Sequence, residues 1–285
     1  MLPARKMNLF DAHNHLQDAW LAPHRARIFA DLASAGVQSA VVNGSSEADW
    51  PDVTALAAAQ ALVRPSYGLH PWDVGNRGPD WQSRLVACLD ANPRAAVGEI
   101  GLDRWILDRA KPDDARLAGL RRAPLAEQSE ALLFQLDLAT SRELPASIHC
   151  LDAHGPLLEL LRTTRRPARG FLLHAYNGSV EMAAAFAKLG AYFSFNGAFL
   201  DPRKERLHAV YRAIPSDRLL VETDSPAMRL PAPREEFAPL ATPNGTLANH
   251  PANLRAAYLG LAELRHTDPA DLAKQVEENF RRFFG

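Results

Sequence analysis

The chain has 285 residues, of which 47% are hydrophobic, 23% charged and 8% aromatic. This composition is typical of a globular protein and excludes a disordered or fibrous chain. The formal net charge is −1, which excludes a general electrostatic attraction for nucleic acid. A polyanionic ligand would therefore have to be held locally, by a patch of charge or by metal.

Two cysteines, Cys88 and Cys150, are too few to cross-link a chain of this length, and this favours a reducing compartment. Residues 1–7 lack the apolar core of a secretory signal, and no stretch reaches the roughly 18 apolar residues of a membrane span. We therefore expect a cytoplasmic protein that acts as a monomer and has no membrane partner.

Short β-like runs alternate with longer helical patterns along most of the chain. The expected strands are, in chain order, 8–11, 37–43, a run ending at 70, 95–100, 146–149, 171–174, 191–195 and 218–224. The expected helices lie near 24–35, 50–62, 80–91 and 125–142, from about 154 onward, at 179–189 and after Asp268. Gly36 is expected to end the first helix. The last helix presents an apolar stripe formed by Leu272, Val276, Phe280 and Phe283.

Most strand starts are about 25–30 residues apart, which is the size of one βαβ repeat. Eight such units predict an α/β fold, a single (β/α)8 TIM barrel over residues 1–285. An open doubly wound sheet is the competing architecture, but no Gly-x-Gly-x-x-Gly motif follows the first strand. Two long connections, 103–124 and 226–250, leave the strand ends where barrel enzymes build active sites. Each is either part of the site or a solvated insertion.

Histidines and carboxylates gather at the predicted strand ends. His13 and His15 are separated by one residue, so a strand directs both imidazoles to the same face. The other groups at strand ends are His70, Glu99, His149, His174 and Asp224. The histidines that fall in helices or loops are interpreted as structural: His24, His154, His208, His250 and His266. Because strand ends converge in a barrel, the first set should meet at its mouth.

Imidazoles combined with carboxylates favour Zn²⁺, Mn²⁺, Co²⁺ or Ni²⁺ over an ion that prefers only oxygen ligands. The set exceeds the three protein ligands that one open catalytic zinc site needs. Two ions about 3.5–4 Å apart, bridged by a carboxylate, would use all of it and activate a water. The residues therefore predict metal-assisted hydrolysis. Neither a Gly-x-Ser-x-Gly elbow nor a P-loop is present to indicate other chemistry.

Seven stretches in this order resemble the TatD-like metal-dependent hydrolases, often described as deoxyribonucleases, among the amidohydrolase-type barrels. They are Asp-Ala-His-Asn-His-Leu at 11–16, Gly-Leu-His-Pro at 68–71, Gly-Glu-Ile-Gly-Leu-Asp at 98–103, 145–149, His174 with Gly178 and Ser179, 192–194, and Glu-Thr-Asp-Ser-Pro at 222–226. Residues 279–284 also resemble the C-terminal helix of the family. The resemblance covers nearly the whole chain.

This resemblance implies two divalent ions per chain, Mg²⁺, Mn²⁺ or Zn²⁺, that share Glu99 as a bridging ligand. The ligands of the first ion would be His13, His15, Glu99 and Asp224. The ligands of the second ion would be Glu99, His149 and His174. Asp224 would also orient or deprotonate the attacking water, and His70 would lie beside the substrate. Behind these groups, Glu222 could orient a metal-bound imidazole, and Asp103 could steady the adjacent loop or cap a turn.

The resemblance also implies a substrate, namely phosphodiester bonds at single-stranded DNA ends, cleaved as by a 3′-end exonuclease. The alternative keeps the metal centre and hydrolyses carboxylic esters or amides, as an aminoacyl-tRNA deacylase or a lactonase-like enzyme would. A third possibility is a metal-stabilised binding protein without catalysis. Three stretches depart from the family pattern: Leu151, 175–177 and Asn-His-Pro at 249–251. They reduce the expected basic charge near the mouth, which the basic segment 104–122 could supply instead.

Overall fold

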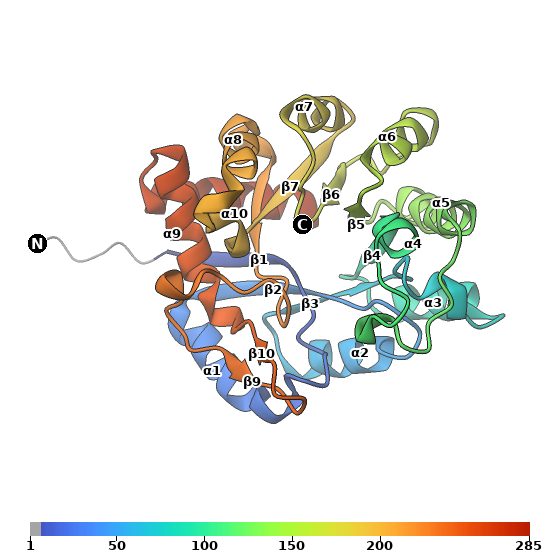
Figure 1. Ribbon diagram of the computed structural model, residues 1–285, viewed down its shortest axis with the longest axis horizontal. Helices are drawn as coiled ribbons and strands as arrows, with labels where there is room; N and C mark the ends of the chain where they lie inside the picture. The colour runs from blue at the N-terminus through green and yellow to red at the C-terminus, as the bar shows by residue number, and fades with distance from the viewer. Residues whose placement is uncertain (1–6) are drawn as a thin grey trace, which may run out of the picture.

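Eight parallel strands alternate with helices and form a barrel in the computed structural model, which describes residues 7–285 (Figure 1). Sheet order follows chain order from β1 to β8. The strands are β1 (Leu9–Asn14), β2 (Val37–Asn43), β3 (Val63–Tyr67), β4 (Ala96–Asp103), β5 (Ala146–Leu151), β6 (Phe171–Leu173), β7 (Ala191–Asn196) and β8 (Leu219–Glu222). This confirms the predicted (β/α)8 architecture. The assignment of residues 1–285 to one domain stays a prediction.

The helices surround the barrel, as the alternating pattern predicted (Figure 1). They are α1 (Arg25–Ala35), α2 (Trp50–Ala59), α3 (Trp81–Ala91), α4 (Trp105–Asp108), α5 (Leu125–Ser141), α6 (His154–Thr163), α7 (Val180–Lys188), α8 (Glu205–Ala213), α9 (Leu254–Arg265) and α10 (Pro269–Phe284). Gly36 ends α1 with a φ of 86°, the left-handed conformation that a C-cap glycine adopts. Within residues 7–285, none of the helices is both long and apolar enough to span a membrane.

The barrel closes where the end of β1 meets the segment after β8. The Asp224 backbone N–H donates to the His13 carbonyl at 3.0 Å, and the His15 N–H donates to the Ser225 carbonyl at 2.8 Å. Asp11 adds a side-chain link, because its carboxylate accepts the Thr223 hydroxyl at 2.6 Å and the Thr223 N–H at 3.1 Å. Closure therefore brings the first and last strand ends side by side.

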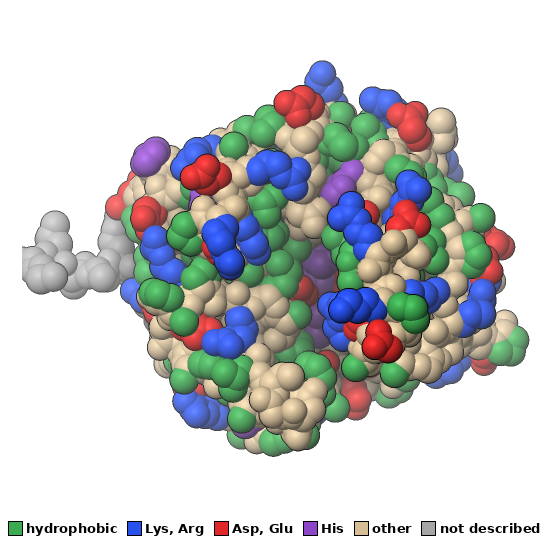
Figure 2. All heavy atoms as spheres, viewed as in Figure 1, with side chains coloured by type: hydrophobic (Ala, Val, Ile, Leu, Met, Phe, Trp, Pro, Cys, Tyr) green, Lys and Arg blue, Asp and Glu red, His purple; other side chains and the backbone are tan. Residues whose placement is uncertain are grey.

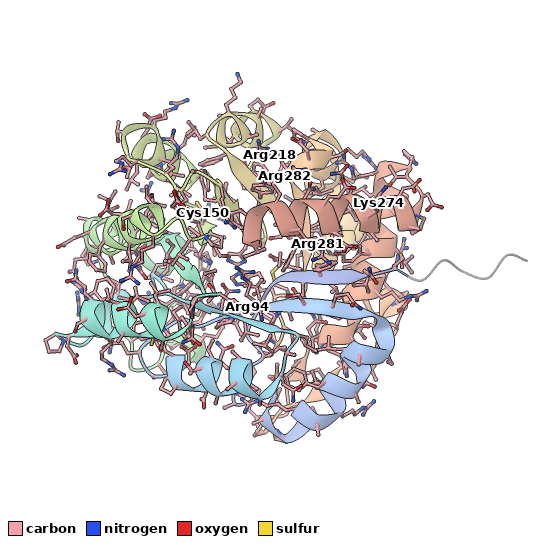
Figure 3. All side chains as sticks on the ribbon, turned by 180° about the vertical axis from the view of Figure 1, so that it is seen from behind. Arg94, Cys150, Arg218, Lys274, Arg281 and Arg282 are labelled. Carbon is pink, nitrogen blue, oxygen red and sulfur yellow. The ribbon has the colours of Figure 1, made fainter. Side chains whose placement is uncertain are left out.

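Helix α10 crosses the end of the barrel opposite the mouth, as the view from behind shows (Figure 3). The side chain of Asp268 caps its N-terminus by accepting the backbone N–H groups of Ala270 and Asp271. The predicted apolar stripe is buried: Phe280 packs on Phe10 with ring centroids 4.9 Å apart, and Phe283 packs on Tyr192 at 4.8 Å. The mouth at the other end is left open to solvent.

Strand β4 runs three residues past the expected end at 100, because Gly101 continues the ladder beside β5. Gly101 pairs with His149, and a Cβ at Gly101 would lie 2.0 Å from the His149 carbonyl oxygen. Its φ of +152° also disfavours any residue with a side chain. This close approach holds the ends of β4 and β5, which carry Glu99 and His149, against each other.

The two long connections carry short elements of their own. The first contains α4 and a 3₁₀ turn at Ala115–Leu117, and the second contains a 3₁₀ turn at Ala232–Arg234 and the hairpin of β9 (Leu240–Ala241) and β10 (Leu247–Ala248). Asn249 ties the second connection to the barrel, since its N–H donates to the Pro226 carbonyl at 2.8 Å. Residues 1–6, on which the expectation of no secretory signal partly rests, lie outside the described residues.

Candidate metal centre

A cavity of ≈ 680 Å³ opens at the C-terminal ends of the strands. The space-filling view shows it as a hollow with histidine and acidic side chains at its floor (Figure 2). Of the predicted site residues, those that line it are His15, His70, Glu99, His149, His174 and Asp224. His13 lies immediately beneath and is fully buried. The structure therefore brings together all seven groups that the sequence placed at strand ends.

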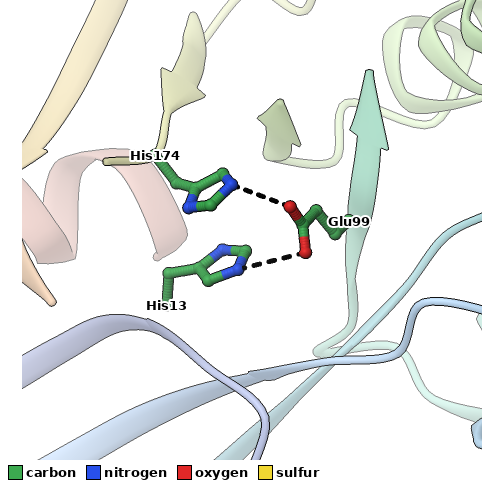
Figure 4. A group of neighbouring side chains, drawn as sticks. All are labelled: His13, Glu99 and His174. Atoms are coloured by element: carbon green, nitrogen blue, oxygen red, sulfur yellow. Dashed lines mark ion pairs between the residues drawn. The ribbon is translucent and has the colours of Figure 1, made fainter. Parts of the chain in front are cut away.

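Glu99 stands at the centre of this arrangement and turns its two carboxylate oxygens to different histidines. Oε1 lies 2.7 Å from His174 Nε2, and Oε2 lies 3.4 Å from His13 Nε2 (Figure 4). Glu99 is only 4% exposed. One buried carboxylate thus faces two separate sets of imidazoles, as a bridging ligand between two ions would.

The first set joins β1 to the segment after β8. His15 Nε2 lies 3.3 Å from Glu99 Oε2 and 3.5 Å from Asp224 Oδ1. His13 Nε2 lies 3.3 Å from His15 Nε2 and 3.8 Å from Asp224 Oδ1. His13, His15 and Asp224 form one of the groups whose ligand atoms all lie within 4.8 Å of one another. These residues, with Glu99 Oε2, could hold one metal ion.

The second set comes from the ends of β5, β6 and β3. His149 Nδ1 lies 3.0 Å from Glu99 Oε1 and 3.3 Å from His174 Nε2. His70 Nε2 also faces Glu99 Oε1, at 3.4 Å. His70 is therefore in contact with the proposed bridging ligand Glu99. Glu99, His149 and His174 could hold a second ion, and His70 lies beside them.

His13, His15 and His149 are each held through the ring nitrogen that does not face Glu99. His13 Nδ1 lies 3.0 Å from the Ser147 hydroxyl, and His15 Nδ1 lies 2.8 Å from the Asn43 carbonyl. His149 Nε2 lies 3.2 Å from Asp103 Oδ2. Such partners orient a ligand ring, and the two that only accept, the Asn43 carbonyl and Asp103, fix the proton on the nitrogen that faces them. The rings are therefore aimed before any ligand arrives.

His174 is held differently, because it rests on a ring and on a buried carboxylate. Its ring stacks on that of His13 with centroids 3.9 Å apart and planes 9° apart. Its Nδ1 lies 3.8 Å from Glu222 Oε1, so this buried nitrogen has no hydrogen-bond partner within range. Glu222 is itself fully buried and accepts the Ser194 hydroxyl and, at 3.2 Å, the Asn196 side-chain N–H. Glu222 thus lies behind the His174 ring without a hydrogen bond to it, and its role in orienting a metal-bound imidazole stays a prediction.

Asp224 reaches the cavity through a backbone turn. Strand β8 ends at Glu222, and Asp224 has a φ of 51°, the left-handed region that Asp tolerates better than most residues. The alternation of a regular strand therefore does not set the direction of Asp224. The turn and the bond from Asp224 N–H to the His13 carbonyl place its carboxylate beside His15.

The residues present fit a pair of cations. In both pairs of histidines the facing ring nitrogens are 3.3 Å apart, and two neutral lone pairs aimed at each other repel. Positive charge near them, from protons or from metal ions, removes that repulsion. Imidazole nitrogens mixed with carboxylate oxygens are the ligand types that Zn²⁺ and Mn²⁺ accept.

Without metal, the pKa values in the cavity reflect this crowding of charge. Burial raises the pKa of Glu99, but the positive charges of His174, His70 and His13 outweigh burial and hold it well below its usual range. Burial lowers the pKa of His149, yet the hydrogen bonds with Asp103 and Glu99 raise it to about 9. Burial lowers the pKa of His70, which favours the neutral ring at pH 7.

None of the basic side chains of segment 104–122 lines the cavity. Arg104 pairs with Asp108 at 2.8 Å, and Arg109 pairs with Asp152 at 3.2 Å. Arg122 donates to the carbonyls of Ile106, Ala110 and Lys111. Among the described residues that line the cavity, none is Lys or Arg. The segment is therefore a locally paired wall near the mouth.

The histidines interpreted as structural lie outside the two ligand sets, and His250 shows why. Its ring is fully buried, stacks on Phe237 with centroids 5.0 Å apart, and accepts the Ala252 N–H. Its Nε2 lies 3.2 Å from Asp31 Oδ2 of α1. The 249–251 stretch therefore lies against α1 and not among the ligand sets.

The sequence reasoning missed several residues that share the cavity, because it searched for metal ligands. They are Gln17, Asp18, Trp20, Asp49, Asp52, Trp72 and Asp73. A usable signal was present, since Trp72 and Asp73 follow His70 within the same strand-end turn.

Comparison with known proteins identifies the family to which this site belongs. The family model described as TatD related DNase matches residues 10–285. The chain belongs to the TatD related DNase family. This confirms the predicted family and the predicted hydrolase class, and the family's metal dependence agrees with the ligand groups described above.

Named relatives and solved structures match over nearly the full length. A protein named 3'-5' ssDNA/RNA exonuclease TatD from Cronobacter sakazakii is 29% identical over 97% of both chains. Its namesake in Escherichia coli is 28% identical over 97% of this chain and 99% of its own. The crystal structure of YJJV, a TatD homolog from Escherichia coli, superposes with a TM-score of 0.81 and 26% identity over 97% of both chains. A TatD family hydrolase from Entamoeba histolytica, 15% identical, shares the fold with a TM-score of 0.78.

Proposed function

We propose that this chain removes nucleotides from the 3′ end of single-stranded DNA by hydrolysing phosphodiester bonds with two divalent cations. The observation that carries the proposal is the position of Glu99, whose two oxygens face separate histidine sets. The first ion would be held by His13, His15, Glu99 and Asp224. The second ion would be held by Glu99, His149 and His174. Mg²⁺, Mn²⁺ and Zn²⁺ are the candidate metals.

When bound, two such ions would lower the pKa of a water and offset the charge of the attacked phosphate. Asp224 lines the cavity and would accept the proton of the attacking water. Burial raises the pKa of Asp224, but the hydrogen bond with His15 and the charges of His174, His13 and His15 outweigh burial and lower it. The carboxylate is thus ionised, and able to accept a proton, at neutral pH.

His70 would orient the substrate by donating a hydrogen bond. Its Nδ1 accepts the Trp72 backbone N–H at 3.2 Å, so the ring proton lies on Nε2, which faces the cavity. His70 Nε2 also lies 3.4 Å from Glu99 Oε1, so the Nε2–H of the neutral ring can donate either to Glu99 or to a phosphate oxygen. Glu99 remains ionised between the two ligand sets.

The names of the relatives support the choice of substrate. Those from Cronobacter sakazakii and Escherichia coli are named as exonucleases that act on single-stranded DNA and RNA in the 3′-to-5′ direction. They match this chain over 97% of its length. Single-stranded DNA and RNA ends are therefore the substrates to examine first.

One observation favours a second candidate function. No Lys or Arg is found among the described residues that line the cavity, whereas Asp18, Asp49, Asp52 and Asp73 all line it. An acidic wall suits a neutral or cationic group better than a chain of phosphates. Hydrolysis of a carboxylic ester or amide, such as removal of an amino acid from tRNA, fits this wall with the same metal ligands.

The deciding experiment follows release of a 3′-terminal label from a single-stranded DNA oligonucleotide. Protein stripped of metal is reloaded with Mg²⁺, Mn²⁺ or Zn²⁺, and Glu99→Ala is purified identically to reveal any contaminating nuclease. Label release by the wild-type protein alone supports the exonuclease. Intact DNA despite bound metal would overturn it, and deacylation of mischarged tRNA by that preparation would establish the second candidate.

A further inference from the structure

Trp72 forms a fixed aromatic wall of the cavity. It lies two residues after His70 in the turn that follows β3, and its ring is half-buried. The indole Nε1–H donates to Asp103 Oδ2 at 2.6 Å, and Asp103 is fully buried. The same Asp103 oxygen lies 3.2 Å from His149 Nε2. One carboxylate therefore orients both the indole ring and a proposed metal ligand.

A stack of planar groups supports Trp72 from the side of the first long connection. The ring of Trp105 lies 6.2 Å from that of Trp72 with planes 23° apart. The Arg116 guanidinium lies 4.8 Å from the Trp105 ring and 6.0 Å from the Trp72 ring. Arg116 is exposed and pairs with Asp114 at 2.6 Å. Trp105 and the exposed Arg116 guanidinium thus pack beside Trp72 at the cavity wall.

A second indole ring lines the same cavity. Trp20 lies in the turn after β1 and is 40% exposed. Its backbone N–H donates to Asp18 Oδ1 at 2.7 Å, which fixes the turn. Among the described residues, the other large hydrophobic side chains that are exposed are Leu133 and Leu247. Packing against the core does not explain a Trp in this position.

The charged side chains that line the cavity outside the ligand sets are acidic. Grooves that bind single strands combine aromatic platforms with basic side chains that follow the backbone. Here the aromatic rings line the cavity, whereas the described lining residues that carry charge outside the ligand sets are Asp18, Asp49, Asp52 and Asp73. Attraction for phosphates cannot come from this lining. The proposed metal ions would attract the phosphates, and the aromatic rings would add affinity for the bases of a strand end.

We infer that Trp72 is a stacking platform for the nucleobase at the end of a single strand, supported by Trp105 and Arg116, and that Trp20 offers a second stacking surface. The inference rests on the proposed nuclease function and names how that site selects its substrate. The strand end is recognised by its flat bases, and stacking requires that they be unpaired. A duplex end, whose bases are already stacked and paired, would be a poor substrate.

The kinetic test compares wild-type protein, Trp72→Ala, Trp72→Phe and Trp105→Ala on three phosphodiesters. The substrates are a single-stranded oligonucleotide, the same strand with abasic terminal residues, and bis(p-nitrophenyl) phosphate. On the normal strand, Trp72→Ala should raise KM about 10- to 100-fold, the loss expected for one base–aromatic stack. The KM of Trp72→Phe should be close to that of wild type. The KM of Trp105→Ala should lie between those of wild type and Trp72→Ala.

The other two substrates separate stacking from a disturbed metal centre. If Trp72 acts by stacking, Trp72→Ala should match wild type on the abasic strand and on bis(p-nitrophenyl) phosphate. An equal loss of activity on all three substrates would overturn the inference. It would show that Trp72→Ala acts by disturbing Asp103 and the proposed ligand His149, and not by removing a stacking surface. An unchanged KM on the normal strand would overturn it as well.

A binding measurement keeps the inference testable if no DNA is cleaved. In an Asp224→Asn background with Mg²⁺, tryptophan fluorescence is titrated with a short oligothymidylate and with its abasic counterpart. We expect saturable quenching by the oligothymidylate that Trp72→Ala greatly reduces and that the abasic strand does not produce. Absence of quenching overturns the stacking platform. Quenching without cleavage by wild-type protein overturns the nuclease and leaves the platform standing.

Discussion

Asp103 and His149 form a carboxylate–imidazole pair in which Asp103 Oδ2 lies 3.2 Å from His149 Nε2. The opposite ring nitrogen, Nδ1, points at Glu99 Oε1 at 3.0 Å. A carboxylate behind a ligand imidazole orients the ring and increases its basicity. Asp103 Oδ1 also accepts the Ile106 N–H at 3.1 Å. Both roles considered from the sequence, steadying the loop and capping a turn, are thus combined in one side chain.

Asp103→Asn should weaken binding at the proposed second ion by about 10- to 100-fold, because an amide is a poorer partner for His149 Nε2. Metal content after dialysis and calorimetric titration of the stripped protein would measure this. Asp108→Asn is the matched control, since the Asp108 side chain is 52% exposed and pairs with Arg104 on the surface. Equal affinity and stoichiometry in both variants would refute the role of Asp103.

Replacing Glu99, the ligand proposed to bind both ions, should change the metal content differently from replacing Asp224, which is proposed to bind one. Glu99→Ala should lose both ions and lower kcat by about 10³-fold or more, because several kcal/mol of charge stabilisation disappear with the ions. Asp224→Asn should retain the ion at Glu99, His149 and His174. Counting bound metal in the two variants checks this. Two ions retained in Glu99→Ala would show that Glu99 is not a bridge.

Much of this arrangement follows from residue types at strand ends. His13 and His15 project to one face because strand side chains alternate, and a barrel brings distant strand ends to one mouth. The direction of Asp224 could not be predicted, since it depends on a φ of 51° after β8. Nor could the contact between Trp72 and Trp105, because it depends on the path of an irregular connection.

The pH dependence of the metal-free protein follows from the pKa of His149. Burial opposes protonation, but Asp103 and Glu99 raise this pKa to about 9, above the usual 6.5. A raised histidine pKa stabilises the fold fully below about pH 6.5, and the contribution is lost as pH rises through about 9. With a chelator present, the difference in Tm between wild type and His149→Gln should therefore shrink from pH 6.5 to 9.5. A constant difference would contradict the raised pKa.

Metal binding should accordingly release protons. His149 has to be neutral to bind an ion, so binding below pH 9 displaces the proton it carries in the metal-free protein. Calorimetry at pH 7.5 in two buffers of different ionisation enthalpy gives the number of protons released. We expect a positive number that falls as pH rises through about 9. The apparent affinity should rise over the same interval, and an affinity independent of pH would count against this assignment.

The last helix should determine stability without affecting the mouth. Phe283 is fully buried at the far end of the barrel, so Phe283→Ala should lower the free energy of unfolding by about 3–5 kcal/mol. Asp268→Ala removes the cap from two backbone N–H groups and should cost about 1 kcal/mol. Thermal and denaturant unfolding would measure both losses. Metal stoichiometry at 20 °C should be unchanged in each variant, because α10 lies across the barrel end opposite the ligand cavity (Figure 3). A lost ion in either variant would show that the two ends of the barrel are coupled.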